Sequence, residues 1–263
     1  MTDVVHLDVT DGRATVTLDD PEVRNALTHD VSTGVVDAFA EVADREVRCV
    51  VVESAAGAFS AGGDVGAMVE NLSGDTPPAE LVDRVVAGPA AAVRAVRTCD
   101  VPTVAKLDGP AFGAGAALAI ACDVLLASEN AKMSFGFRQV GLAVDSGVSH
   151  LLPRLVGENV AKELVYTGEL VDADRAAEIG LFNRVYDAAA FETETEAVVE
   201  RIATGPTVAL SASKRLLEQG FDSSLDEAIA NEATTQAVTM STDDHREGAT
   251  AFVEKREPDF EGE

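Results

Sequence analysis

Apolar and polar residues alternate at the start of the chain with the period of two that is typical of half-buried strands. Val4–Val9 and Arg13–Leu18 carry this alternation on either side of Asp11-Gly12, which is a hairpin turn signal. From Thr28, which suits a helix N-cap, apolar residues recur at helical spacing, and Arg48–Glu53 then has the composition of a buried strand. The pattern predicts two strands, a helix and a third strand.

The order of strand, turn, helix and strand recurs farther along the chain. Similar units stacked in series indicate an α/β fold and favour a spiral over a flat, doubly wound sheet. Between residues 64 and 127 we expect a short helix over Asp64–Val69, a loop over Asn71–Pro78, a helix over Ala79–Arg97, a strand over Pro102–Leu107, a turn and helix over Gly109–Ala119, and a strand over Val124–Ala127.

Helices dominate the chain after Ser146, and the composition changes near Gly205. We therefore expect a spiral core over residues 1–204 and a helical C-terminal region over residues 205–263. Ser224 and Glu227 have the spacing of a capping box at the start of the longest helix. The expected elements are helices over Gly147–Leu155, Asn159–Tyr166, Ala173–Ile179, Phe191–Ala203, Pro206–Glu218 and Ser224–Met240, and a strand over Phe182–Tyr186.

The length and composition suit a protein with a large core. The chain has 263 residues, of which 46% are hydrophobic, and a globule of this length buries roughly 70–75% of its unfolded surface. No apolar run is long enough to span a membrane, and the first residues lack the pattern of a secretory signal, so we expect a cytoplasmic protein. The three cysteines lie among apolar residues and the four histidines are scattered, so we expect reduced thiols and no metal site.

Acidic residues outnumber basic ones by 46 to 20, which gives a formal charge of −26. Nucleic acid and anionic membranes are poor partners for such a surface. A salt-rich cytoplasm would screen the repulsion among these charges, so the composition suggests a halophilic protein.

Two glycine-rich turns carry the candidate chemistry. Gly57–Asp64 follows the strand-like Val50–Val52, and Gly109–Ala119 follows Thr103–Leu107. Either turn alone would indicate no more than a tight connection, and neither continues as the Gly-Lys-Ser/Thr of a phosphate loop. Together they can present two backbone N–H groups, and a pair of convergent N–H groups is what an oxyanion needs.

Five segments along the chain form a recognisable set of motifs: Pro21–Leu27, Phe59–Asp64, Gly109–Gly115, Ala121–Asp123 and the tail Glu247–Phe260. Taken in this order they resemble the motifs of the crotonase (enoyl-CoA hydratase/isomerase) family. The resemblance covers essentially the whole chain and implies a crotonase-type ββα spiral as the catalytic core. It also implies acyl-CoA thioester substrates, no permanently bound cofactor, and C-terminal helices that pack on neighbouring subunits in trimers or dimers of trimers.

The same resemblance assigns roles to individual residues. The backbone N–H groups of Gly63 and Ala114 would hold the thioester oxygen as an enolate develops. Coenzyme A would lie along residues from both ends of the chain: Arg24, Ala61, Asp64, Val65, Phe252 and Lys255.

The chain departs from the family at both hydratase glutamates. Alignment of the motifs places Ala117 at the first of these positions and Phe137 at the second. One carboxylate remains nearby, Asp145, in a Gly-Leu-x-x-Asp-x-Gly segment that resembles the epoxyphenylacetyl-CoA and dienoyl-CoA isomerases of the family. One carboxylate is enough to move a proton between two carbons. A structural alternative is that Asp145 is the N-cap of the next helix.

Several functions therefore stay open. An acyl-CoA isomerase is the leading hypothesis, followed by an enoyl-CoA hydratase of fatty-acid or aromatic-acid degradation that uses Asp145 and a second group, and by a CoA-thioester hydrolase. A homologue that binds acyl-CoA without catalysis is the alternative from another class. Asp123 lies between a helix and a strand and suits a structural role. The Gly-x-Ser-x-Gly pattern of serine hydrolases is absent.

Overall fold

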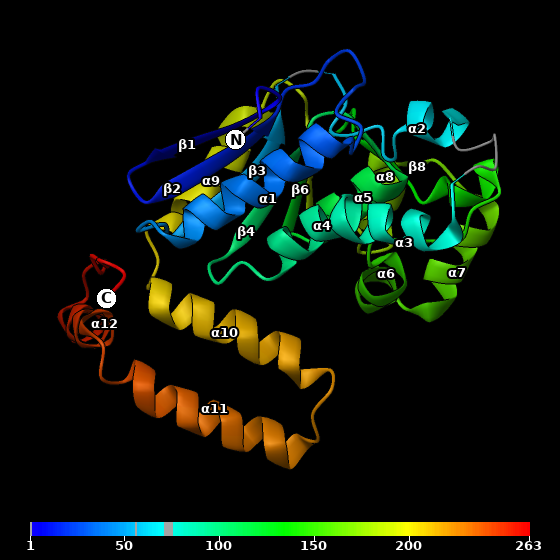
Figure 1. The fold of residues 1–263 in the computed structure, drawn as a ribbon. Coiled ribbons are helices and arrows are strands. Elements are labelled where there is room, and N and C mark those ends of the chain that lie inside the picture. The colour runs from blue at the N-terminus through cyan, green and yellow to red at the C-terminus, as the bar shows by residue number, and fades with distance from the viewer. Residues whose placement is uncertain (1, 56, 71–75) are drawn as a thin grey trace.

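The computed structural model describes residues 2–55, 57–70 and 76–263, so most of the loop expected over Asn71–Pro78 lies outside the described residues. The main sheet has the strand order β1-β2-β3-β4-β6-β9 (Figure 1). β1 and β2 pair as the antiparallel hairpin predicted around Asp11, and the later pairings are parallel. The strands are β1 (Val5–Thr10), β2 (Arg13–Leu18), β3 (Cys49–Ser54), β4 (Thr103–Leu107), β6 (Val124–Ser128) and β9 (Arg184–Tyr186).

A second, smaller sheet has the order β5-β7-β8, with strands over Pro110–Phe112, Lys132–Ser134 and Val171–Asp172. The chain leaves β4 of the main sheet to form β5 of the small sheet, and it leaves β6 to form β7. A parallel bridge between Ser60 and Ala111 adds the turn after β3 to the same layer. Successive units therefore contribute to both sheets, which is the mixed α/β, spiral arrangement that the repeated pattern predicts.

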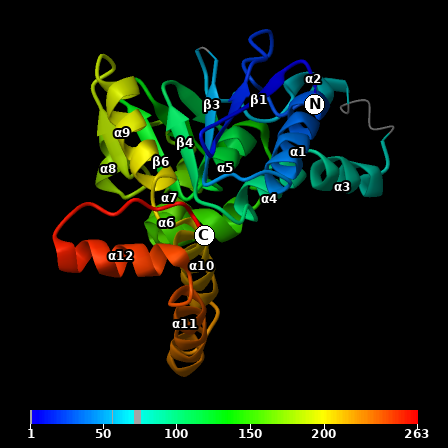
Figure 2. The same ribbon diagram turned by 90° about the vertical axis from the view of Figure 1, so that its left-hand side faces the viewer.

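Helices cover both faces of the main sheet (Figures 1 and 2). On one face lie α1 (His29–Ala43), α4 (Pro89–Arg97) and α5 (Gly113–Ile120), and their apolar residues join the larger core. Thr28 caps α1 by accepting a hydrogen bond from the Val31 N–H, as its sequence position predicts. α5 consists of small and aliphatic residues that are almost all buried, so the helix can sit inside the core.

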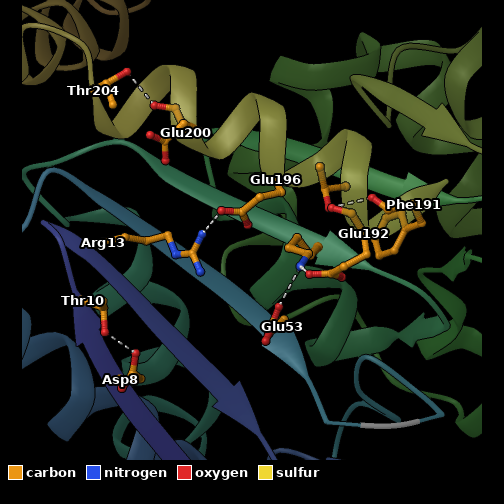
Figure 3. Close-up of polar contacts among 11 residues, drawn as sticks. Asp8, Thr10, Arg13, Glu53, Phe191, Glu192, Glu196, Glu200 and Thr204 are labelled. Carbon is orange, nitrogen blue, oxygen red and sulfur yellow. Dashed lines mark hydrogen bonds and ion pairs between the residues drawn. The ribbon is translucent and has the colours of Figure 1, made fainter. Parts of the chain in front are cut away.

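α9 (Phe191–Ala203) lies on the other face and is attached by both apolar and ionic contacts. Val199 and Ala203 pack with apolar residues of β3, β4 and β6. Arg13 of β2 pairs with Glu196 of α9 (Figure 3). The buried Lys106 ammonium lies 2.7 Å from Glu192 of the helix and 3.2 Å from Glu53 of β3. These pairs satisfy cations whose burial would otherwise be unfavourable.

One expected helix is two helices in the structure. The segment predicted as a single helix over Ala79–Arg97 forms α3 (Pro78–Ala87) and α4, with a break at Gly88. Pro89 causes the break because it has no N–H to donate to the preceding turn. The helix expected within Gly109–Ala119 begins only at Gly113, because Pro110–Phe112 pairs with β7. The other helices are α2 (Val65–Glu70), the 3₁₀ helix η2 (Gly136–Val140), α6 (Val148–Val156), α7 (Glu158–Thr167) and α8 (Ala173–Glu178).

The C-terminal helices lie apart from the core (Figures 1 and 2). α10 (Thr207–Gly220) runs beneath it, α11 (Leu225–Thr239) lies on the far side of α10, and α12 (Asp243–Glu254) crosses near the start of α10. The predicted capping box at Ser224 is present. α12, by contrast, was not expected from the sequence. None of the helices in the described ranges is both long and apolar enough to cross a lipid bilayer.

Polar contacts attach α10 to the core. The buried Lys214 ammonium lies 2.8 Å from the Asp123 carboxylate, which also accepts hydrogen bonds from the N–H and hydroxyl of Thr103. The structural role expected of Asp123 is confirmed by these contacts. At the other end of α10, the Arg48 guanidinium donates to the carbonyl oxygens of Gly205 and Phe260, at 2.7 and 2.9 Å. Arg48 therefore fastens both the start of α10 and the C-terminal tail.

Candidate active site

The two glycine-rich turns are in direct backbone contact. The Phe112 N–H donates to the Ser60 carbonyl at 2.9 Å, and the Ser60 N–H donates to the Pro110 carbonyl at 3.3 Å. A Cβ on Gly115 would lie 2.4 Å from the Ser60 hydroxyl oxygen, so no larger residue fits there. Gly109 has the same constraint, since its Cβ would lie 1.9 Å from the Gly57 carbonyl oxygen. The small residues of these turns are needed for the close approach itself.

A third segment holds the first turn in place. Arg24 and Asn25 both have positive φ, at 53° and 55°, and form a tight turn after β2. The buried Asn25 amide donates to the Ala58 carbonyl at 3.0 Å, and the Ser60 hydroxyl donates to the Asn25 carbonyl at 2.6 Å. The Ala61 N–H donates to the Arg24 carbonyl at 2.9 Å. The two residues named for coenzyme A in this region, Arg24 and Ala61, are thus brought together by the backbone.

Gly63 and Ala114 belong to two segments that are in contact. A Cβ on Gly62 would lie 3.6 Å from the Ala114 nitrogen, so the first turn lies against the start of α5. Ala114 is in the first turn of that helix, where N–H groups have no partner within the helix and a negative charge is favoured. In the described part of the chain, the Gly63 N–H donates no backbone hydrogen bond either. Neither N–H group has a backbone partner among the described residues.

Apolar side chains lie beside both glycine-rich turns. The Met68 methyl group lies beside Gly63, 2.6 Å from the position that a Cβ there would take. The Phe137 ring lies 3.8 Å from the corresponding position on Gly113. Phe137 is 8% exposed and Ala117 is fully buried. The two positions that the motif alignment equates with hydratase glutamates therefore carry buried apolar residues in this chain.

Asp145 lies just before α6, a helix that packs against α5. The N-cap of α6 is Gly147 and no side chain caps it, so the interpretation of Asp145 as a cap is wrong. One carboxylate oxygen, Oδ1, is buried without a hydrogen-bond partner among the described residues. Burial raises the pKa of this carboxyl group, and the neighbouring Ser146 hydroxyl acts in the opposite direction.

One chain does not bring all of the proposed coenzyme A residues together. Arg24, Ala61, Asp64 and Val65 belong to the turns described above or to the start of α2. Phe252 lies on α12 and is 85% exposed, and Lys255 ends that helix with a φ of 57°. In both views α12 lies on the opposite side of the molecule from α2 (Figures 1 and 2).

Ser60, Cys49 and Cys122 are poor candidates for a nucleophile. The Ser60 hydroxyl donates to Asn25 and accepts from the Gly62 N–H at 3.2 Å, so it supports the turn. Cys49 and Cys122 are buried, and burial raises the pKa of the Cys49 thiol to about 12. A thiol with such a pKa is protonated at neutral pH and is a poor nucleophile.

Comparison with known proteins agrees with the motifs and the fold. The family model for enoyl-CoA hydratase/isomerase matches residues 9–263. The chain is 34% identical to the crotonyl-CoA hydratase of Syntrophomonas wolfei over 244 residues, 91% of each protein. The solved enoyl-CoA hydratase of Mycobacterium smegmatis is 32% identical, with a TM-score of 0.90 and 98% of both chains covered.

A solved enoyl-CoA hydratase/isomerase from Cupriavidus metallidurans is 28% identical, with a TM-score of 0.91 over 100% of this chain and 97% of the other. The fold and the two paired glycine-rich turns are therefore those of a crotonase-type protein. The chain belongs to the enoyl-CoA hydratase/isomerase family of enzymes.

Two residues with notable geometry had no role assigned from sequence. Asn25 lies within the Pro21–Leu27 motif and is followed by the apolar Ala26 and Leu27, but its neighbour Arg24 is charged, so the sequence does not reveal that the amide is buried. Ser146 has a φ of 48° and a buried hydroxyl, and no sequence signal reveals either property.

The burial of Asp145 makes a prediction about stability. Since the pKa of its carboxyl group is higher in the folded protein than its ordinary value near 3.8, ionisation opposes folding, and this destabilisation grows as the pH rises through that range. An amide costs less to bury than a carboxylate. We expect Asp145→Asn to raise the free energy of unfolding near pH 7.5, and the gain to shrink towards pH 4. Denaturant titrations at both pH values measure it, and an Asn variant that is less stable at pH 7.5 would contradict it.

Gly63 provides a test of the proposed oxyanion donors. Gly63→Pro removes the N–H, and loss of one such donor lowers turnover by about 100- to 1,000-fold in enzymes where it has been measured. Gly63→Ala is the matched control because it keeps the N–H and meets only the flexible end of Met68. We expect the alanine variant to retain far more turnover than the proline variant, provided that both melt as the parent does. Equal turnover in the two variants would rule out the Gly63 assignment.

Proposed function

We propose that the protein is an acyl-CoA isomerase that moves a proton through an enolate of the thioester. The observation that carries the proposal is the buried, unpartnered carboxylate oxygen of Asp145, combined with apolar residues at Ala117 and Phe137. A carboxyl group with a raised pKa is a stronger base once it is ionised, and it can hold the proton between two steps.

The proposed reaction keeps one base for both proton transfers. The Asp145 carboxylate removes a proton from the α-carbon of a 3-enoyl thioester, and the electron pair moves into the thioester carbonyl. The N–H groups of Gly63 and Ala114 stabilise the negative oxygen that develops. Asp145 then returns the proton to the γ-carbon, the double bond shifts, and a 2-enoyl thioester forms with no atom gained or lost. No permanently bound cofactor takes part.

Coenzyme A is proposed to extend from these donors along Arg24, Ala61, Asp64 and Val65. Phe252 and Lys255 would then have to come from a neighbouring subunit, because they lie far from this turn on one chain. A protein with a formal charge of −26 needs local cations for the phosphates of coenzyme A, and Arg24 and Lys255 supply them in this proposal.

Hydration of a 2-enoyl thioester is the second candidate. The observation that favours it is that the relatives from Syntrophomonas wolfei and Mycobacterium smegmatis are named hydratases. Hydration needs an acid and a base arranged around one water molecule. Asp145 could supply one of these, and the apolar Ala117 and Phe137 could not supply the other.

Deuterium incorporation tests the role of Asp145. In D₂O the parent protein should introduce deuterium at the α- or γ-carbon of a 3-enoyl-CoA ester and convert it to the 2-enoyl ester without addition of water. Asp145→Asn cannot accept a carbon-bound proton, so we expect incorporation to fall by at least about 100-fold while coenzyme A ester binding persists. Mass spectrometry measures both the label and any added water.

Asp8→Asn is the control for the loss of one negative charge, because Asp8 is exposed on β1. It should exchange deuterium at the parent rate. Undiminished exchange in a folded Asp145→Asn variant would rule out Asp145 as the base. Addition of one water to a 2-enoyl ester would favour the hydratase, and ester binding without any exchange by the parent would favour a homologue without catalysis.

We infer further that the protein assembles through its C-terminal helices in a salt-rich cytoplasm. α11 has no buried residue in the described chain, so its apolar side chains face outward. A hollow of about 530 Å³ lies where α11 meets α12 and is lined in part by Met240, His245 and Val253. Exposed apolar side chains in this region are Leu217, Leu225, Ile229, Val238, Met240, Phe252 and Val253. Apolar surface of this kind is typical of subunit interfaces.

Dialysis from high salt tests the assembly and the salt dependence together. At about 2 M KCl, where the Debye length is below about 3 Å, we expect a trimer or a dimer of trimers in sedimentation. In dilute buffer, repulsion among the acidic residues should dissociate it and lower the melting temperature. A monomer at every salt concentration would contradict the assembly, and an unchanged melting temperature would contradict the salt adaptation.

A further inference from the structure

Ser146 combines a buried hydroxyl with an unfavourable backbone conformation. Its side chain is 5% exposed, and its Oγ has no hydrogen-bond partner among the described residues. Its φ of 48° lies in the left-handed region that residues other than glycine rarely adopt. Glycine adopts this region at lower cost, as Gly147 does with a φ of 82°. Since glycine would fit the backbone better, the serine hydroxyl needs an explanation.

The adjacent residue supplies a complementary atom. Asp145 Oδ1 is a buried acceptor without a partner in the described chain, and Ser146 Oγ is a buried donor without one. The hydroxyl is close enough to lower the pKa of the carboxyl group, although the two oxygens do not have hydrogen-bond geometry in this structure. Buried polar atoms are rarely left unpaired, so two such atoms on consecutive residues indicate a functional arrangement.

The surroundings offer Asp145 little other polar support. Val93 of α4 and Leu151 of α6 lie 3.9 and 3.8 Å from the position of a Cβ on Gly147. The charged or titratable residues of α4 and α6 are Arg94, Arg97, His150 and Arg154, and none of them contributes to the pKa of Asp145. Within the described residues, burial and Ser146 are the two influences on this carboxyl group.

We propose that Ser146 is a positioning residue for Asp145. In the proposed active arrangement the Ser146 hydroxyl donates to the Asp145 carboxylate, and this hydrogen bond holds the ionised acid in the orientation that removes the substrate proton. A hydroxyl that donates to a carboxylate stabilises the ionised form more than the protonated form. Ser146 therefore offsets part of the effect of burial and keeps Asp145 available as a base. This inference rests on the proposed role of Asp145.

Two variants and one matched control separate this role from packing. Ser146→Ala removes the hydroxyl and keeps the left-handed backbone problem, whereas Ser146→Gly removes the hydroxyl and relieves it. If the alanine variant fails to fold, the glycine variant still tests the proposal. Ser32→Ala is the control, because Ser32 on α1 is also buried with an unpartnered Oγ but takes no part in the site.

The first measurement is the titration of Asp145 itself. It uses carbon-13 NMR of protein labelled at its aspartate carboxyl groups, and the signal that is missing from Asp145→Asn identifies Asp145. We expect both Ser146 variants to raise the midpoint by about one pH unit, and Ser32→Ala to leave it unchanged. The second is the pH dependence of deuterium exchange into a 3-enoyl-CoA ester. Exchange requires the ionised base. In the two Ser146 variants the pH range over which the exchange rate rises should therefore move to higher pH by the same amount, while KM changes less than twofold.

The outcomes distinguish the two proposals. Asp145→Asn could abolish deuterium exchange while both Ser146 variants keep the parent titration midpoint of Asp145 and the parent pH dependence of the exchange rate. In that case the Ser146 proposal is wrong and the proposed function stands. A lower rate at every pH with an unshifted pH dependence would assign Ser146 a packing role and also overturn the Ser146 proposal. An increase in KM alone would mean that the hydroxyl contacts substrate instead. If Asp145→Asn still exchanges deuterium, both proposals fail.

Discussion

The contact between the two glycine-rich turns is the constraint on which the rest of the site depends. Ser60 lies at its centre, because its backbone bonds to Pro110 and Phe112 while its hydroxyl bonds to Asn25. This arrangement leaves no room for a side chain at Gly115. The proposed oxyanion donors, the N–H groups of Gly63 and Ala114, lie in the two segments that this contact joins. In that proposal the contact preorganises the two donors, and preorganised donors need no rearrangement when negative charge develops.

The rest of the fold supports that contact. The strand preceding each turn belongs to the main sheet, which is held between α9 on one face and α1, α4 and α5 on the other. The ion pairs of Lys106 with Glu53 and Glu192 attach α9 to β3 and β4, the two strands that precede the turns. Lys214 and Arg48 fix the C-terminal helices at the opposite side.

The sequence predicted what local patterns determine. The hairpin, the Thr28 cap, the bounds of α9 and the Ser224 capping box all follow from spacing and side-chain chemistry. The missed elements are those whose local signal is weak: β7 and β8 have three and two residues, and their pairing depends on segments far away in the chain. α12 is rich in polar residues, although Thr242 caps it in the usual way. Gly88-Pro89 is a helix-breaking pair that can be recognised in the sequence, but the helical spacing of apolar residues continues across it.

The features of the candidate site also fall into those that the sequence reveals and those that it does not. Glycine-rich turns can be recognised from sequence because they need particular residues, and so can the absence of glutamates at Ala117 and Phe137. The state of Asp145 could not be recognised, since its burial, its unpartnered oxygen and the left-handed conformation of Ser146 arise from tertiary packing. Sequence alone left the cap and the base as competing interpretations of Asp145. The position of Gly147 at the start of α6 removed the first of them.

The apolar surroundings of the two donors bear on which reaction this architecture favours. A water molecule held for attack needs two or more polar partners, and the cost of ordering it falls only when those partners are in place. Phe137 beside Gly113 and the buried Ala117 provide none. A proton that passes between two carbons of one substrate needs only a base within reach of both and a stabilised oxygen. Under the proposed role of Asp145, the apolar residues at Ala117 and Phe137 would therefore weaken hydration more than isomerisation.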